Sequence, residues 1–393
     1  MNTNLGLLQN IANKSERLIL GLMSGTSLDG LDLALCRISG SANQTQLTLA
    51  AFKTIAYPES FKTALRTVFA QKQVDLEKLT LLNAYIGNYH AELVLQSLKE
   101  WGVKPDEVDA IASHGQTIYH APKHFHGQKD YPNATLQIGD GDHLAVKTGI
   151  LTLSDFRQKH LAAGGEGAPL AIYGDYVLFS SPDENRILLN LGGIANFTFL
   201  PQSGDVGQIL STDVGPANTL IDAVVQAYFQ QDFDRDGLIA RSGQVNQALL
   251  EELMKHPFIV EQLPKSTGPE LFNLSFVESA ISKLKLNLKP EDIVATLSRL
   301  TAEIVAKTIR NNFNYPNTAI YSSGGGIHNH FLMDQLMALL PDIKFSSLDT
   351  LGIHPDAKEA VLFAILANET LVGEPMEFGY GPAVSLGKIS FPK

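Results

Sequence analysis

Cysteine, positive charge and long apolar runs are all scarce in this sequence. A single cysteine, Cys36, excludes an internal disulfide, fits a reducing compartment and is interpreted as a buried structural thiol. The net charge of −11 argues against a nucleic acid or an anionic membrane as a partner, because both need a basic face. No stretch approaches the ~20 apolar residues of a membrane helix, and the first residues do not form a signal sequence. The sequence therefore predicts a cytoplasmic protein with a small or metal-complexed ligand.

The chain is too long for one hydrophobic core. Single cores stop growing at roughly 250–300 residues, so a chain of 393 residues predicts two domains. A hydrophobic content of 44% and a charged content of 18% are those of an ordinary soluble globular protein.

The most informative stretch is a predicted hairpin near the N-terminus. Two apolar runs, at 18–23 and 31–38, flank the small and polar residues 24–30. The segment lacks the lysine of a Walker loop, and it returns as a strand, whereas the Walker loop and the dinucleotide fingerprint both lead into a helix. A phosphate loop between two antiparallel strands is typical of the superfamily of sugar kinases, actin and heat-shock chaperone ATPases, which this segment resembles.

The turn of this hairpin has the groups needed to hold a nucleotide's phosphates. Its glycines let main-chain N–H groups converge on phosphate oxygens, and its hydroxyls add further donors. Asp29 would hold magnesium directly or through water, while Asp32 could equally brace the hairpin. An ordinary turn is the alternative, since turns use the same residue types. The residues assigned to ATP here are Ser24, Gly25, Thr26, Ser27, Leu28, Asp29, Gly30, Leu31 and Asp32.

Both halves of the chain are expected to contain three strands, a helical region and a strand that ends in a glycine turn. In the first half these are the hairpin, a strand at 46–56, helices at 59–69 and 76–101, and a strand at 108–112. In the second half they are strands at 186–200 and 208–211, helices at 217–230 and 290–311, and a strand at 318–322. This order predicts an α/β protein of two ribonuclease H-like domains, with mixed sheets flanked by helices and the active site in the cleft between them.

The predicted domain boundaries follow from this repetition. Residues 1–165 and 374–393 would form the N-terminal domain, and residues 166–373 the C-terminal domain. The glycine-rich segment 163–169 would be the crossover between them.

Asp213 is the predicted catalytic base. It follows the strand at 208–211 and precedes Gly215 and a helix started by Pro216, so its carboxylate should point into the cleft. A helix cap or loop residue is the alternative. Phosphoryl transfer needs mainly charge neutralisation, in-line positioning and a base of this kind.

Glycine clusters in the second half are also assigned to the nucleotide. Gly215 and Asn218 would approach the phosphates at the positive end of the helix that follows. A later cluster would leave room for the sugar and base of the nucleotide. The full set is Gly192, Gly193, Gly215, Asn218, Gly324, Gly325 and Gly326.

Polar residues after strands of the first half, and one at the start of the last long helix, are expected to bind a sugar-like substrate. Arg157 is suited to gripping a carboxylate with two parallel hydrogen bonds. His114 could instead be an ordinary loop histidine, and Glu359 could simply favour the positive end of its helix. The set is Ser113, His114, Gln116, Asp155, Arg157 and Glu359.

Separated segments between residues 21 and 373 resemble the anhydro-N-acetylmuramic acid kinase family. They are GLMSGTSLDGLD at Gly21, SHGQTI at Ser113, QIGD at Gln137, DFR at Asp155, AAGGEGAPL at Ala162, LNLGGIANFT at Leu189, DVGPAN at Asp213, PKSTGPELF at Pro264, GGGIHN at Gly324 and GIHPDAKEAVLFAILAN at Gly352. The resemblance implies ATP and Mg²⁺ as cofactors, and 1,6-anhydro-N-acetylmuramic acid and water as substrates. The family resemblance is the sole basis for expecting a homodimer.

The same resemblance implies the reaction. An aspartate, here Asp213, activates water to attack the anomeric carbon, the 1,6-anhydro bridge opens, and O6 takes the γ-phosphoryl group of ATP. The product is N-acetylmuramic acid 6-phosphate, an intermediate of peptidoglycan recycling. A carboxylate that acts on water beside an anomeric carbon is also found in inverting glycosidases.

Two features depart from that family. Val214 stands where the family usually has threonine, so a hydroxyl is lost beside the predicted base. The polar excursion at 120–131 is longer than expected. Its histidines, His120, His124 and His126, are separated by glycine, proline and lysine, which favours a surface loop over a metal site.

Two other functions are weaker alternatives. A chaperone-like or regulatory ATPase on the same scaffold would normally carry an extra peptide-binding or assembly segment, and the sequence shows no surplus region of that kind. A plain glycoside hydrolase would leave the phosphate turn without a purpose.

Overall fold

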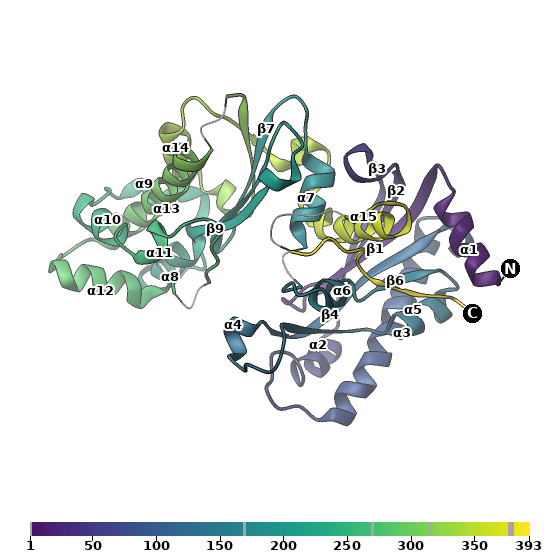
Figure 1. The fold of residues 1–393 in the computed structure, drawn as a ribbon. Helices are drawn as coiled ribbons and strands as arrows, with labels where there is room; N and C mark the ends of the chain where they lie inside the picture. Colours follow the sequence, from purple (N-terminus) through teal and green to yellow (C-terminus); the bar gives the residue numbers. More distant parts are fainter. Residues whose placement is uncertain (1, 168–169, 269–270, 314–315, 376–380) are drawn as a thin grey trace. The chain divides into compact units, whose positions relative to one another are not determined.

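The predicted hairpin lies at the centre of a seven-stranded sheet in the computed structural model (Figure 1). Its strands, β1 (Glu16–Ser24) and β2 (Gly30–Ser39), pair antiparallel along their whole length. Both strands are mostly buried because helix α15 (Lys358–Val372) packs on one face, while apolar residues of α3 (Leu76–Glu100) join their core on the other. Burial on both faces explains why the two runs are almost continuously apolar.

The structure describes residues 2–167, 170–268, 271–313, 316–375 and 381–393, and the chain forms two units. Unit 1 comprises Met1–Phe179 and Ile353–Lys393, and unit 2 comprises Ser180–Gly352. Three predicted features fall partly outside the described residues: the crossover at Ala168 and Pro169, the motif from Pro264 at Pro269 and Glu270, and the tail of the N-terminal domain at residues 376–380.

The observed boundaries differ from the predicted ones. Helices α7 (Ala171–Phe179) and α15 were assigned to the C-terminal domain but belong to unit 1. The reason is packing, since α15 contacts β1, β2 and β4 (Ala110–Ala121), and α7 contacts α15. These contacts are invisible in a linear sequence.

Unit 1 has the strand order β12-β6-β4-β1-β2-β3, with β5 paired to β4. Strand β4 is parallel to β1 and β6, and the tail strand β12 is antiparallel to β6. The remaining elements of this unit are α1 (Thr3–Ala12), β3 (Gln46–Ala56), α2 (Glu59–Arg66), β4 (Ala110–Ala121), α4 (Lys123–His126), β5 (Ala134–Ile138), α5 (Gly141–Thr148), β6 (Thr152–Ser154), α6 (Phe156–Ala162) and β12 (Lys388–Ser390).

Unit 2 repeats the central part of this sheet. Its order, β11-β10-β7-β8-β9, matches β6-β4-β1-β2-β3, with the same parallel and antiparallel pairings. This repetition confirms the predicted fold class. The elements are β7 (Asn185–Leu191), β8 (Ile194–Leu200), β9 (Leu210–Pro216), α8 (Asn218–Phe229), α9 (Leu238–Ser242), α10 (Gln247–Leu253), α11 (Pro257–Val260), α12 (Leu274–Leu284), α13 (Pro290–Asn312), β10 (Thr318–Ser323), α14 (His330–Leu339) and β11 (Lys344–Ser347).

Two strands extend further than their sequences indicate. The strand predicted at 108–112 continues to Ala121 as β4, and the strand predicted at 208–211 continues to Pro216 as β9. In β4 a bulge at Gly115, with a left-handed φ of 72°, lets the strand continue through polar residues. The residues that were expected to follow these strands therefore lie within them.

Among the helices in the described ranges, none is both long enough and apolar enough to cross a membrane.

Gly21 provides a test of how closely α15 packs on β1. A β-carbon at position 21 would lie 1.9 Å from the carbonyl oxygen of Ala360. We expect Gly21→Ala to lower the free energy of unfolding by about 1–3 kcal/mol or more, because the helix must move away. Gly6→Ala in α1 is the control, since a β-carbon there has no neighbour within 4 Å. Urea denaturation measures both variants, and a Gly21→Ala protein as stable as the wild type would contradict this packing.

Candidate functional site

The predicted phosphate turn is exposed at its tip. Thr26 and Ser27 are exposed, whereas Leu28 adopts a left-handed backbone, with a φ of 57°, and buries its side chain in the core of unit 1. Leu31 is also buried, so these two leucines can offer only backbone groups to a ligand. Within the described part of the chain, the N–H groups of Thr26 and Ser27 donate to no protein atom. The tip therefore has unused donors for an anion.

The two acidic residues of the turn have different surroundings. One oxygen of Asp29 accepts hydrogen bonds from the Ser27 hydroxyl at 2.7 Å and the Gly30 N–H at 3.0 Å. The bond from Ser27 lowers the pKa of Asp29, which keeps this exposed carboxylate ionised. Burial raises the pKa of Asp32, whose carboxylate accepts a hydrogen bond from Thr54 of β3 at 2.6 Å. Asp32 thus links β2 to β3, and Asp29 is the better candidate for a metal.

Asp29 fits the kind of magnesium site that kinases use. Magnesium is usually bound by one or two carboxylates together with water and substrate phosphates. The second carboxylate oxygen of Asp29 accepts no hydrogen bond from another described residue. Groups of three or more histidine, cysteine or acidic side chains that could hold a metal alone are absent from the described residues.

Arg157 and His114 of unit 1 are joined by a hydrogen bond, and Glu359 lies within electrostatic range of Arg157. The Nε of Arg157 donates to the Nε2 of His114 at 3.1 Å, and its Nη1 donates to the carbonyl of Gly167 at 2.7 Å. Burial, followed by the charge of Arg157, lowers the pKa of His114 to about 3, so the imidazole is neutral. Desolvation by surrounding atoms, followed by the charge of Asp32, raises the pKa of Glu359 despite its exposure. His114 therefore orients the guanidinium.

Ser113, Asp155 and Gln116 are placed differently from that group. Ser113 and Asp155 line, with His114, a cavity of about 250 Å³, where Asp155 forms an ion pair with Lys388 of β12. Gln116 is 1% exposed and uses both N–H groups on the carbonyls of Gly25 and Thr117. The prediction that Ser113, His114 and Gln116 follow a strand is wrong, because all three lie inside β4. Gln116 is thus better suited to holding the turn than to holding a sugar.

Asp213 lies within β9, opposite Asn196 of β8, and not in a loop after the strand. One of its oxygens accepts hydrogen bonds from the Thr267 N–H at 2.8 Å and the Ser266 hydroxyl at 3.2 Å. Burial raises the pKa of Asp213, and these two hydrogen bonds oppose the rise. The other oxygen accepts no hydrogen bond from a described group. The result is an oriented carboxylate with one oxygen left for a proton.

Val214 belongs to the apolar core of unit 2. It is fully buried among apolar residues of that core. Val214 is the extra residue of a bulge in β9, because Asp213 pairs with Asn196 of β8 and Gly215 pairs with Ala195. The bulge interrupts the simple alternation of side chains, and the valine side chain is used in apolar contacts with the core.

The glycine bend of unit 2 contacts the start of helix α8. The carbonyl of Gly193 accepts from the N–H groups of Ala217 and Thr219, and that of Gly192 accepts from the N–H and side-chain amide of Asn218. These bonds consume the first donors of the helix. An anion at this helix N-terminus would have to displace them, so Asn218 instead holds the bend in place.

The later glycine cluster lies beside the same bend. A β-carbon on Gly324, whose φ is 84°, would lie 2.6 Å from the side-chain oxygen of Asn190, and one on Gly326 would lie 2.7 Å from Leu191. A β-carbon on Gly325 would meet nothing closer than Asn218, at 4.0 Å. Gly215 packs against Ile304 of α13. Gly325 is thus the member of the cluster with open space for a ligand.

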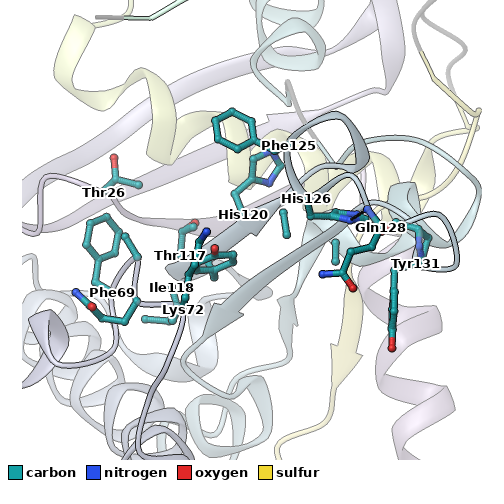
Figure 2. Close-up of a pocket in the computed structure, with 16 residues that line it drawn as sticks. Thr26, Phe69, Lys72, Thr117, Ile118, His120, Phe125, His126, Gln128 and Tyr131 are labelled. Carbon is teal, nitrogen blue, oxygen red and sulfur yellow. Dashed lines mark hydrogen bonds between the residues drawn. The ribbon is translucent and has the colours of Figure 1, made fainter. Parts of the chain in front are cut away.

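A cavity of about 970 Å³ adjoins the phosphate turn in unit 1. Figure 2 shows Thr26, Phe69 and Lys72 on one side of it and Tyr131 on the other. Phe125 and Tyr131 are 81% and 63% exposed, and no acidic residue is among the described lining. The polar excursion thus builds a wall of an aromatic, non-acidic pocket.

Several residues that shape these sites were not predicted. Ser266 and Thr267 orient Asp213. Tyr57 forms a hydrogen bond with Ser24, and His90 forms one with Tyr57. Ser266 and Thr267 belong to the family motif PKSTGPELF, so the resemblance could have indicated that they lie near the active site. Nothing in the sequence indicated a role for Tyr57 or His90, because a tyrosine before proline and a histidine inside an apolar helix resemble ordinary core residues.

The repeated strand order, with a glycine turn after the first strand of each unit, is that of the actin-like fold, which the sugar kinases share.

Sequence comparison narrows this class to one family. A family model described as anhydro-N-acetylmuramic acid kinase matches residues 17–389, and the chain belongs to that family. A relative of that name from Pseudoalteromonas translucida is 52% identical over 399 residues, covering 100% of both chains. One from Pseudoalteromonas atlantica is 52% identical over 400 residues with the same coverage. One from Caldanaerobacter subterraneus subsp. tengcongensis is 39% identical, covering 97% of this chain and 98% of its own.

The neutral state of His114 predicts a pH dependence of stability. Its pKa falls from about 6.5 in the unfolded chain to about 3 in the folded protein, so the unfolded state binds more protons between these values. The stability that His114 contributes is complete above pH ~6.5 and is lost progressively as the pH falls, by up to about 1.4 kcal/mol per pH unit.

We therefore expect the stability advantage of the wild type over His114→Gln to shrink between pH 7 and pH 4. Glutamine can still accept a hydrogen bond from Arg157 but does not titrate. Denaturant titrations at several pH values measure the difference, and a constant difference across this range would contradict a buried, neutral histidine.

Proposed function

We propose that the protein uses ATP to convert 1,6-anhydro-N-acetylmuramic acid into N-acetylmuramic acid 6-phosphate, in the recycling of cell-wall peptidoglycan. Membership of the family over residues 17–389 favours this kinase over a chaperone-like or regulatory ATPase. The observation that carries the proposal is Asp213, a half-buried carboxylate with one oxygen held by Thr267 and Ser266 and the other available.

Asp213 acts as the general base for water. Because burial raises its pKa, it is a stronger base than an exposed aspartate, while its two hydrogen bonds keep it ionised near neutral pH. It takes a proton from the water whose oxygen bonds to the anomeric carbon. The bond from that carbon to O6 breaks, and its electron pair stays on O6. O6 then bonds to the γ-phosphorus of ATP as the bond to the β-phosphate oxygen breaks and ADP leaves.

The turn of unit 1 binds the terminal phosphates of ATP. The free N–H groups of Thr26 and Ser27 donate to the phosphate oxygens, and Gly25 lets them approach the backbone, because a β-carbon there would meet nothing closer than 3.4 Å. Asp29 would hold Mg²⁺ through the oxygen that has no hydrogen-bond partner. A bound Mg²⁺ would supply positive charge to neutralise the phosphates during transfer. In unit 2, Gly325 has the open backbone that could accept part of a nucleotide.

The sugar binds to unit 1. Arg157, oriented by His114, pairs with the lactyl carboxylate, and Glu359 accepts a hydrogen bond from a hydroxyl. The body of the sugar occupies the 970 Å³ pocket, whose aromatic walls suit a ring with apolar faces. Burial, and then the charge of Arg157, lowers the pKa of the pocket residue His120, which indicates that Arg157 lies within electrostatic range of this pocket.

The remaining features of the proposal concern the protein's surroundings. A cytoplasmic location fits the use of ATP and the buried free thiol of Cys36. The acidic charge disfavours nucleic acid and membrane partners. A homodimer stays a prediction from the family resemblance alone.

The central test combines the protein with ATP, Mg²⁺ and anhydro-N-acetylmuramic acid and follows the phosphorylated, ring-opened sugar by mass spectrometry. We expect Asp213→Asn to reduce kcat by roughly 10²- to 10⁴-fold, because a general base contributes about that much. ATP binding should change little, since asparagine can still accept from Thr267. Asp222→Asn, which alters another half-buried carboxylate of unit 2 with its pKa raised by burial, is the control. Turnover of Asp213→Asn at the wild-type rate would exclude Asp213 as the base.

The pocket of Figure 2 gives a separate test. We expect Phe125→Ser and Tyr131→Ser each to raise KM for the sugar roughly 2- to 10-fold, because an aromatic contact is worth about 0.5–1.5 kcal/mol. KM for ATP should stay unchanged, and stability should change little since both rings are exposed. Tyr228→Ser, at a 50% exposed tyrosine of unit 2, is the matched control. If neither pocket variant alters KM for the sugar, the sugar binds elsewhere.

A further inference from the structure

Tyr57 holds both ends of the phosphate turn. Its backbone N–H donates to the carbonyl of Asp29 at 2.9 Å, and its hydroxyl lies 2.8 Å from the hydroxyl of Ser24. The exposed residues Thr26 and Ser27 lie between these two anchors. Tyr57 is itself 3% exposed and packs against Phe61 of α2. The shape of the turn therefore depends on one buried residue outside it, through its backbone at one end and its side chain at the other.

A chain of buried polar side chains extends from Tyr57 in both directions. The Tyr57 hydroxyl lies 2.9 Å from Nε2 of His90 on α3, and the Ser24 hydroxyl donates to Oε1 of Gln116 at 2.6 Å. The amide of Gln116 then donates to the carbonyl of Gly25 at 3.1 Å. All four side chains are at most 3% exposed, so water cannot replace a lost partner.

The hydrogen bonds that link these four side chains can run in only one direction. The nitrogen of Gln116 faces two carbonyls, which only accept, so its oxygen must face Ser24. The single hydrogen of the Ser24 hydroxyl is used on that oxygen, so Tyr57 must donate to Ser24. The hydrogen of Tyr57 is then used as well, so His90 must donate to Tyr57 from Nε2.

We propose that His90 and Tyr57 are positioning residues for ATP: they hold Ser24 and Gly25 so that the free N–H groups of the turn face the phosphates before ATP arrives. The inference rests on the proposed kinase function, which assigns the turn to ATP. A preorganised turn loses less conformational freedom on binding and therefore binds more tightly. Burial lowers the pKa of His90 to about 4, so the imidazole is neutral at neutral pH and its Nε2 proton is fixed by the hydrogen bond to Tyr57.

The test is calorimetric binding of Mg-ATP without sugar, combined with steady-state kinetics. Tyr57→Phe removes the hydroxyl and keeps the ring, and His90→Leu removes the donor. We expect both to raise the Kd and KM for ATP about 5- to 30-fold and to leave KM for the sugar within twofold. His90→Gln, whose amide can donate in place of Nε2, should restore most of the affinity. Val94→Ala is the matched control, since it alters a buried residue one turn along α3 that is not among the four hydrogen-bonded side chains.

Two outcomes would overturn the inference. The first is that the Tyr57→Phe and His90→Leu proteins fold and bind ATP as tightly as the wild type. The second is that Val94→Ala loses as much ATP affinity as these two variants when its melting temperature falls by a similar amount. If the variants do not fold, nitrogen NMR of wild-type His90 still decides, because an Nδ1-protonated tautomer contradicts the chain. A protein that binds ATP as expected but forms no product would refute the kinase proposal and leave this inference standing.

Discussion

Unit 1 depends on satisfying polar groups that are buried where water cannot reach. A buried donor or acceptor without a partner costs about 1–3 kcal/mol. Ser24, Tyr57, His90 and Gln116 avoid this cost by bonding to one another beneath the turn. Arg157 does so by bonding to its neutral neighbour histidine. The donors that are left over after this internal pairing, at the tip of the turn, are the ones available to a ligand.

The two units share a topology but not the chemistry of their glycine turns. In unit 1 the turn spans residues 25–29, and Thr26 and Ser27 at its tip are exposed. In unit 2 the bend is two residues long, and its carbonyls pair with the first N–H groups of α8. Equivalent positions in a repeated fold thus do different work: one turn presents donors, while the other fastens a helix to a sheet.

The sequence was informative wherever function or fold depends on local pattern. The apolar runs of β1 and β2, the third strand and the long helix α3 follow from periodicity, and β3 has the predicted bounds. The extent of β4 could not be predicted, since polar residues at 113–117 resemble a loop and are tolerated only because partners from other elements satisfy them. The pairing of Tyr57 with His90 joins positions far apart in the chain. Short helices such as α6 and α7 depend on contacts with α15 and β5 that no local pattern encodes.

The placement of α15 has a consequence for how the chain is made. This helix is buried from Ala360 to Glu369 and lies directly on β1, where Gly21 leaves room for it, and Asn368 accepts a hydrogen bond from Arg17 at 2.7 Å. Unit 2 is one uninterrupted segment and can fold as soon as it leaves the ribosome. Most of unit 1 is translated first, but its helix α15 is translated only after unit 2. One face of the apolar strands β1 and β2 therefore stays exposed while the whole of unit 2 is synthesised.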